Sequence, residues 1–223
     1  MTPRTPVLIA VAAVSAFSFI GPRPTGTAEA TEAKPPAAGS RSKYRVDMTK
    51  SRFIVETQTS GLAAMFAHDH KMEVGDFAGT ATFTAGALAT GASLQMTVKA
   101  ESLHLVDEAS VGARQSVESA LRQEVLETDK YPEIAFKTSA VTSSLRGDGS
   151  YGVRLTGDLS LHGVRRRITV PARVSLQDDD LHAIGTFDVR QTDFNITPSS
   201  FVSGTVTIKD EVTISFDIVA HRI

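Results

Sequence analysis

The stretch that decides the fold is residues 151–174, which read YGVRLTGDLSLHGVRRRITVPARV. An alternation of apolar and polar or small residues on both sides of a glycine corner predicts a long antiparallel hairpin with one apolar face. A soluble chain can bury such a face by closing its sheet into a barrel, and a barrel of suitable size has an interior. The corner is His162-Gly163, and the alternating apolar positions are Val153, Leu155, Leu159, Leu161, Ile168, Val170, Ala172 and Val174.

The same alternation recurs along most of the chain and predicts further strands. Turn signals such as Gly147-Asp148-Gly149 separate them. Eight or nine strands in about 180 residues is the number that a small closed barrel needs. We therefore expect an all-β fold, a single antiparallel β-barrel of about eight strands. The further strands are expected around residues 52–59, 70–74, 77–83, 94–100, 134–140, 181–189 and 212–218.

One segment departs from this alternation. In Gln115–Glu127 the apolar residues Val117, Leu121 and Val125 recur at every fourth position, without an intervening glycine or proline. This period predicts one short amphipathic helix that ends before Pro132. Its apolar stripe suits a position over a barrel wall or mouth, and we expect the helix to close one end of the barrel.

The N-terminal region has the three parts of a secretory signal. Arg4 precedes an apolar run from Val7 to Ile20. The small residues Ala28 and Ala30 then stand at the positions that a signal peptidase recognises before it cleaves. The next residues are rich in Ala, Pro, Ser and Gly, a composition typical of flexible segments. We therefore expect a signal peptide at 1–30, a flexible leader at 31–42 and the folded domain at 43–223.

The composition excludes several classes of function. The 223 residues include no cysteine, which excludes disulfides, thiol catalysis, cysteine-ligated zinc, iron–sulfur clusters and covalently attached c-type haem. A formal net charge of −2 argues against a nucleic-acid partner, which usually selects a basic surface. Beyond the signal no segment is long and apolar enough to cross a bilayer, so we expect a mature chain without a transmembrane segment. The expected location is periplasmic or secreted.

Three stretches resemble the YceI family in their order and spacing. They read YPEIAF at 131–136, LTGDLSLHGV at 155–164 and TDFNI at 192–196, and the resemblance extends from about Tyr44 to the C-terminus. It implies a lipocalin-like antiparallel barrel with an elongated internal pore that holds a polyisoprenoid or a similar amphiphilic chain. It also implies export, and some members of the family are linked to b-type membrane cytochromes.

The chain departs from the family pattern in three places. Many members carry Arg-Asp-x-His-Leu before the helix, where this chain reads RQSVE at 114–118. The usual arginine before Asp-Phe is replaced by Gln191-Thr192, with Arg190 just upstream, and additional sequence at 60–71 carries two histidines. These departures lie where the polar end of a ligand would be bound. The polar mouth that we predict comprises His68, His70, His162 and Arg190.

His68 and His70 also allow a metal site. Side chains two positions apart on a strand point to the same side, which suits ligation of Zn, Fe or Cu. A third ligand would be needed, and no second motif requires one. The alternative is a partly buried, hydrogen-bonded histidine, and for His162, at the hairpin corner, a local hydrogen bond to the turn is the simpler interpretation. The residues that could supply the third ligand are His104, Asp107, Glu108 and His162.

These observations favour a non-enzymatic protein that holds a long apolar amphiphile, such as a polyisoprenoid, a quinone or a similar lipid. The sequence has no nucleophile elbow, phosphate loop, zinc-protease helix or dinucleotide fingerprint. A metal-binding protein or metal-dependent enzyme using His68 and His70 is the alternative. No cofactor beyond the bound lipid is expected, a b-type membrane cytochrome is a possible partner, and a homodimer is left open. The residues predicted to line the pore are Phe53, Val55, Phe83, Met96, Phe136, Phe187 and Phe216.

Overall fold

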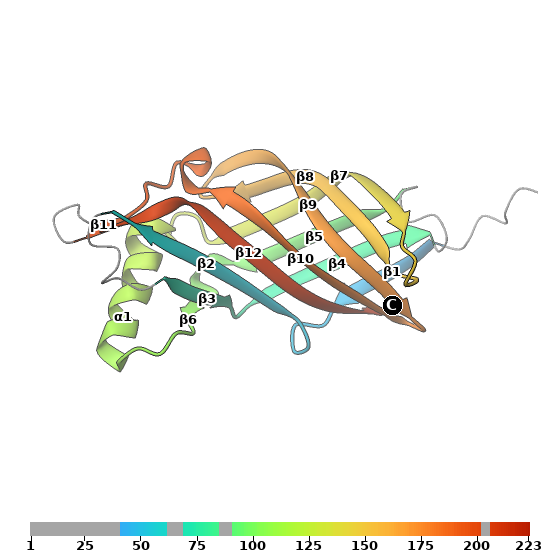
Figure 1. Ribbon diagram of the computed structural model, residues 1–223, viewed down its shortest axis with the longest axis horizontal. Helices are drawn as coiled ribbons and strands as arrows, with labels where there is room; N and C mark the ends of the chain where they lie inside the picture. Colours follow the sequence, from blue (N-terminus) through green and yellow to red (C-terminus); the bar gives the residue numbers. More distant parts are fainter. Residues whose placement is uncertain (1–40, 62–68, 85–90, 202–205) are drawn as a thin grey trace, which may run out of the picture. The chain divides into compact units, whose positions relative to one another are not determined.

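The computed structural model describes residues 41–61, 69–84, 91–201 and 206–223, and it shows an antiparallel β-barrel (Figure 1). The predicted fold class is confirmed, because every strand pairing in the sheet is antiparallel. The strands are β1 (Arg41–Val46), β2 (Arg52–Ser60), β3 (His70–Val74), β4 (Phe77–Thr84), β5 (Ser93–Lys99), β6 (Leu103–Leu105), β7 (Glu133–Leu145), β8 (Tyr151–Leu161), β9 (Val164–Gln177), β10 (Asp180–Arg190), β11 (Ser200–Phe201) and β12 (Val206–Arg222).

Eight of these strands close the barrel, in the order β1-β4-β5-β7-β8-β9-β10-β12, and β12 returns to β1. The closing strand β12 is 17 residues long and pairs with two different strands along one of its edges. Its last residues pair with β1, and its earlier residues pair with β2, from which β3 and β6 continue the sheet. Strand β1 begins at Arg41, so residues 41 and 42 of the expected leader belong to the first strand.

The hairpin of residues 151–174 forms as predicted. Strands β8 and β9 stay in register from Tyr151 opposite Val174 to Leu161 opposite Val164. The two corner residues, His162 and Gly163, have φ angles of +50° and +73°. Two positive φ angles in a two-residue loop are what the right-handed twist of a hairpin requires, and glycine adopts them without strain.

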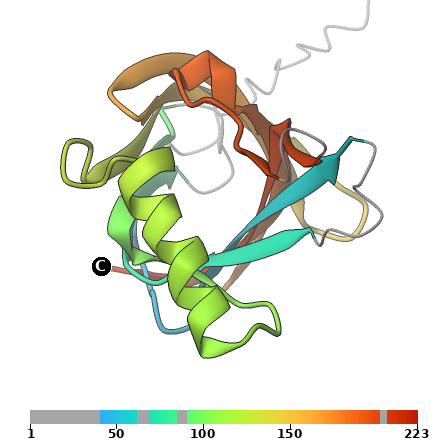
Figure 2. The same ribbon diagram turned by 90° about the vertical axis from the view of Figure 1, so that its left-hand side faces the viewer.

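The predicted helix is confirmed, and it begins four residues earlier than expected. Helix α1 (Val111–Ala120) starts after Ser110, whose hydroxyl accepts a hydrogen bond from the N–H of Ala113, and a π-helical turn (Leu121–Val125) extends it. The helix lies across one end of the barrel (Figure 2). No residue of α1 is fully buried, so it covers this end without forming part of a dense core. Within the described ranges no helix has the length and apolar character that a membrane span needs.

Two glycines make room for aromatic rings against the inner wall. Gly157 and Gly185 occupy inward positions of the alternation on β8 and β10. A Cβ atom on Gly157 would lie 2.8 Å from Cζ of Phe136, and one on Gly185 would lie 2.5 Å from Cζ of Phe216. The rings therefore lie against the glycines, a cross-strand arrangement known to stabilise glycine in sheets. This packing leaves space along the barrel axis.

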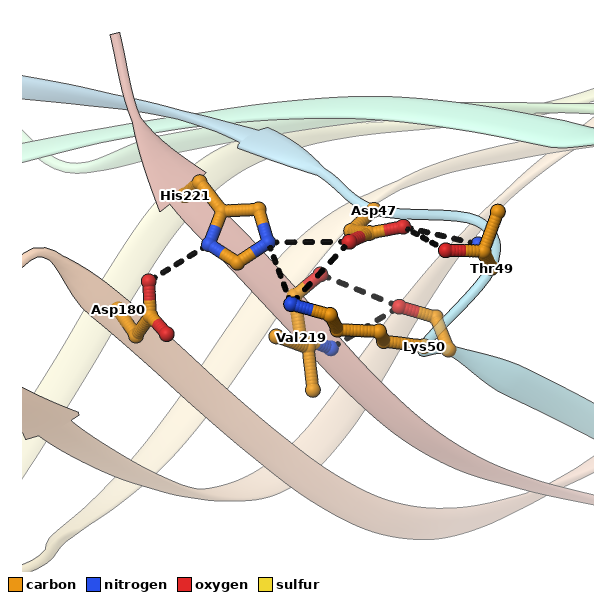
Figure 3. Close-up of polar contacts among 7 residues, drawn as sticks. Asp47, Thr49, Lys50, Asp180, Val219 and His221 are labelled. Carbon is orange, nitrogen blue, oxygen red and sulfur yellow. Dashed lines mark hydrogen bonds and ion pairs between the residues drawn. The ribbon is translucent and has the colours of Figure 1, made fainter.

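At the end of the barrel opposite α1, a polar cluster joins three strands (Figure 3). His221 on β12 lies between two carboxylates: its Nδ1 is 2.6 Å from Asp180 on β10, and its Nε2 is 3.0 Å from Asp47 after β1. A carboxylate can only accept, so both contacts are hydrogen bonds only when His221 carries two N–H groups as imidazolium. Asp47 also accepts from Thr49 and lies 3.8 Å from the ammonium of Lys50. The cluster ties β1, β10 and β12 where the barrel closes.

This cluster makes stability depend on pH in a defined direction. Hydrogen bonds to Asp180 and Asp47 raise the pKa of His221, so its contribution is complete below its unfolded pKa of about 6.5 and is lost as pH rises through the folded value. Hydrogen bonds from Thr49 and His221 lower the pKa of Asp47 to about 2, so its contribution is complete above about pH 4 and is lost as pH falls toward 2.

We therefore expect the melting temperature to fall between pH 6 and pH 8.5, and to fall less in the His221→Gln variant. Glutamine has no proton to lose in this range, so the variant lacks the pH-dependent part of the contact between β10 and β12. Thermal melts of both proteins across the range measure the difference. Parallel curves for the two proteins would mean that His221 does not contribute.

Candidate functional site

The barrel encloses an apolar cavity of about 530 Å³. It is lined by the inward faces of the barrel strands, by β2 and β3, and by the inner side of α1 and its π-helical extension. Of the 46 lining residues within the described ranges, 39 are apolar, and none is Lys, Arg, Asp or Glu. Cavities of this size and composition are typical of sites for small or chain-like apolar ligands.

All seven residues that the sequence predicted as pore lining face this cavity. Three of them form a run of aromatic rings, since the centroid of Phe216 lies 6.0 Å from that of Phe53 and 6.4 Å from that of Phe187. These rings are only half-buried although they point into the barrel, because the cavity lies in front of them. Contact with a ligand stays a prediction for each. The seven are Phe53, Val55, Phe83, Met96, Phe136, Phe187 and Phe216.

The polar lining residues occur at the two ends of the cavity. Thr82 and Ser93 lie opposite each other on β4 and β5, near the end where β12 finishes, and their hydroxyl oxygens are 2.7 Å apart. The others lie near α1 and the start of β12. We call this second group the α1-end polar group; it comprises Thr57, His70, Ser116, Gln191 and Ser199. The wall between the two ends is apolar.

His70 is the titratable residue of the α1-end polar group. Its Nδ1 lies 3.2 Å from Oδ2 of Asp107, and the same oxygen accepts the backbone N–H of Lys71 at 2.9 Å. Asp107 precedes α1, and its carbonyl accepts a hydrogen bond from Arg114 on that helix. The imidazole is therefore held in one orientation by a carboxylate that is itself fixed to β3 and to α1.

Of the other predicted mouth residues, the two that the structure describes, His162 and Arg190, do not line the cavity. His68 falls outside the described residues. The ring of His162 is turned away from the cavity: its Nε2 is 2.7 Å from Glu127, its Nδ1 is 3.2 Å from the carbonyl of Phe194, and the ring packs edge-on against Tyr131. The expected local bond of His162 to its turn is thus replaced by contacts distant in sequence. Arg190, at the end of β10, is exposed.

For the alternative of a metal site, the structure shows one of the expected neighbours and no complete set of ligands among the described residues. His70 does meet Asp107, one of the residues considered as a third ligand. Among the residues that the structure describes, no group of three His, Asp or Glu side chains is arranged to hold a metal ion. A site that includes His68 stays a prediction.

The sequence missed how α1 is attached to the barrel. Strand β6 is the outer strand of the β2-β3-β6 extension, and two side chains of α1 bind the backbone of its last residue. The N–H of Leu105 donates to Oε1 of Glu118 at 3.0 Å, and its carbonyl accepts from Arg114. Leu105 itself is 1% exposed. Arg114 and Glu118, four residues apart on one helix face, thus bind both backbone groups of a fixed strand residue and hold α1 over the cavity.

We expect Glu118→Ala to loosen α1 while the barrel remains folded. The N–H of Leu105 would lose its partner, and loss of a hydrogen bond to a charged group costs about 1.5–3 kcal/mol. Amide hydrogen exchange over 111–126 should therefore become roughly tenfold faster, with exchange in β8 and β9 unchanged. Glu124→Ala is the matched control, because Glu124 is exposed on the next turn. Equal exchange rates in the two variants would contradict the role of Glu118.

Comparisons with known proteins agree with this architecture. Residues 44–220 match the family model of the YceI-like domain. The crystal structure of BcnA from Burkholderia cenocepacia is similar, with a TM-score of 0.61 and 24% identity, over 78% of this chain and 98% of the other. A polyisoprenoid-binding domain from Saccharophagus degradans, implicated in plant cell wall breakdown, is similar with a TM-score of 0.58 and 14% identity, over 81% of this chain and 98% of the other. The YceI protein of Campylobacter jejuni is similar with a TM-score of 0.51 and 17% identity, over 67% of this chain and 83% of the other.

At these identities the structural neighbours support the barrel fold alone, and no curated protein sequence gives a significant match. The family model carries the assignment, because its match runs from within β1 to within β12 and includes the YPEIAF and LTGDLSLHGV stretches. The chain belongs to the YceI-like domain family.

Proposed function

We propose that this protein is a non-enzymatic binding and carrier protein for a long apolar amphiphile, held with its chain along the barrel axis. The observation that carries the proposal is the cavity of about 530 Å³ with its almost wholly apolar lining. Each methylene of a ligand moved from water into such a lining contributes about 0.8 kcal/mol, so a long chain gains affinity along its whole length. A polyisoprenoid, a quinone or a similar lipid is the proposed ligand class.

Two further observations support this ligand class. A structural neighbour from Saccharophagus degradans is a polyisoprenoid-binding domain. The cavity also has polar side chains at its ends and an apolar wall between them, which suits a molecule with a polar head and a long apolar chain. We propose a periplasmic or secreted location, on the signal pattern of residues 1–30. A b-type cytochrome partner and a homodimer stay predictions.

Mass spectrometry of the gently purified protein tests the proposal. A native spectrum should show a mass increment that disappears after organic extraction, and the extract should contain a stoichiometric isoprenoid, quinone or comparable lipid. Metal analysis of the same sample should show no stoichiometric metal. Protein without lipid that carries about one metal per chain would instead support the alternative based on His68 and His70.

A further inference from the structure

We propose that the α1-end polar group recognises an uncharged head group that donates a hydrogen bond, such as the hydroxyl of a long-chain alcohol, a phenol or a hydroquinone. It would discriminate against phosphate and pyrophosphate head groups. The inference rests on the proposed function and specifies the chemical class of the ligand's polar end. Three independent features of this end of the cavity carry it.

The first feature is that the hydroxyls of Thr57 and Ser116 and one N–H of the Gln191 amide are already bound by the protein. The hydroxyl of Thr57 donates to the carbonyl of His70 at 3.4 Å, and the hydroxyl of Ser116 donates to that of Gly112 at 2.9 Å. The amide nitrogen of Gln191 donates to the carbonyl of Lys209 at 2.9 Å. In each case an oxygen with lone pairs remains for a ligand. These side chains therefore act toward the cavity mainly as acceptors.

The second feature is the tautomer of His70. Because the carboxylate of Asp107 can only accept, the imidazole Nδ1, 3.2 Å away, carries the hydrogen. In the neutral ring Nε2 is then an acceptor, and it is the polar atom that His70 can offer to the cavity it lines. The Lys71 N–H on the same carboxylate oxygen, and the Arg114 contact to the Asp107 backbone, keep this arrangement in place.

The third feature is the absence of cationic side chains. Among the described residues that line the cavity, none is Lys or Arg. The three segments between strands that lie outside the described residues read LAAMFAH at 62–68, AGALAT at 85–90 and VSGT at 202–205; none contains Lys or Arg, and the first ends in His68. Two nearby lysines have partners: Lys71 pairs with Glu56 at 3.0 Å, and Lys209 donates to Gln58 at 2.7 Å.

Together these features distinguish between head groups. A phosphate has acceptor oxygens and negative charge, so it would face acceptors without a cation to balance it, which is unfavourable at a partly desolvated site. A hydroxyl donates one hydrogen bond, which His70 Nε2 or the free oxygens can accept. A head group that can only accept, such as an ether or a quinone carbonyl, lacks this interaction.

Competition binding with three ligands of one chain tests the inference: geranylgeraniol, its methyl ether and geranylgeranyl pyrophosphate. The alcohol should bind about tenfold more tightly than either of the others. In His70→Phe, which keeps a planar ring and loses the acceptor, the preference for alcohol over ether should shrink to about twofold. Asp107→Asn should also reduce it, because an amide can donate to Nδ1 and place the ring hydrogen on Nε2.

A matched control is Thr156→Val on β8, outside the cavity lining, whose hydroxyl contacts that of Thr169 on β9; it should leave the preference unchanged. Equal or tighter binding of the pyrophosphate, or an unchanged preference in a folded His70→Phe and in Asp107→Asn, would overturn the inference while the binding function stands. If none of the three ligands binds to the wild-type protein, the proposed function fails, and the inference fails with it.

Discussion

Ala183→Trp is expected to reduce the affinity for a prenyl chain about 50-fold while the barrel remains folded. Ala183 lies in the first half of β10, faces the cavity and packs against both hydrophobic clusters of the barrel. An indole at this position would occupy space that about three methylenes of the ligand need. At about 0.8 kcal/mol for each methylene, the loss is about 2.4 kcal/mol, and tenfold in affinity corresponds to about 1.4 kcal/mol.

The adjacent residue offers a matched control for this variant. Ile184 points outward and is 40% exposed, so Ile184→Trp adds the same side chain to the same strand without entering the cavity. Competition binding with geranylgeraniol and thermal melts of both variants give the comparison. Wild-type affinity in a folded Ala183→Trp would show that the ligand does not occupy the cavity, whereas a loss in both variants would point to a general effect on β10.

Local patterns explain why so much of the barrel could be predicted. An alternation of period two reports which residues share a face, and in a small barrel one face must be inside. Strands with clean alternation, such as β8, β9 and β10, were therefore predicted together with their inward residues. The short β6 and β11 carry too few residues for a pattern. The start of α1 was missed because Ser110 caps a first turn that has little apolar character.

The polar features depend on contacts that join distant parts of the chain, and these could not be predicted. His221 meets Asp47 across 174 positions, and the backbone of Leu105, which Arg114 and Glu118 bind, is positioned by the pairing of β6 with β3. The acceptor character of the α1-end polar group is likewise a result of register: Thr57 donates to the carbonyl of His70 because these two residues lie opposite each other on β2 and β3.

The seven lining residues were identified for a different reason. Each is a large apolar side chain at an inward position, so pattern and size together were sufficient. The space in front of them was not predictable, because it depends on small residues at neighbouring positions of the facing strands. From the sequence, Gly157 and Gly185 indicate only that two strands are locally less stable. The structure shows that they accommodate the rings of Phe136 and Phe216.

Gly185→Ala is expected to be strongly destabilising. A Cβ at this position would lie 2.4 Å from the carbonyl oxygen of Pro171 on β9 and 2.5 Å from Cζ of Phe216 on β12. The first of these atoms is backbone and cannot rotate away, and the Phe216 ring is constrained by Phe53 and Phe187. Overpacking of this kind costs typically 1–3 kcal/mol, and a site confined on two sides belongs at the upper end.

For a domain of this size, about 3 kcal/mol corresponds to a fall in melting temperature of roughly 6–12 °C. Gly147→Ala is the matched control, because Gly147 lies in the turn between β7 and β8 and a Cβ there would meet no atom within 4 Å. Its melting temperature should stay within about 2 °C of the wild type, since surface changes without contacts are usually within 0.5 kcal/mol. Similar melting temperatures for the two variants would refute the close approach of Phe216 to Gly185.

If Gly185→Ala instead relaxes by turning Phe216 inward, prenyl-chain affinity should fall together with stability, because the displaced ring takes up part of the cavity.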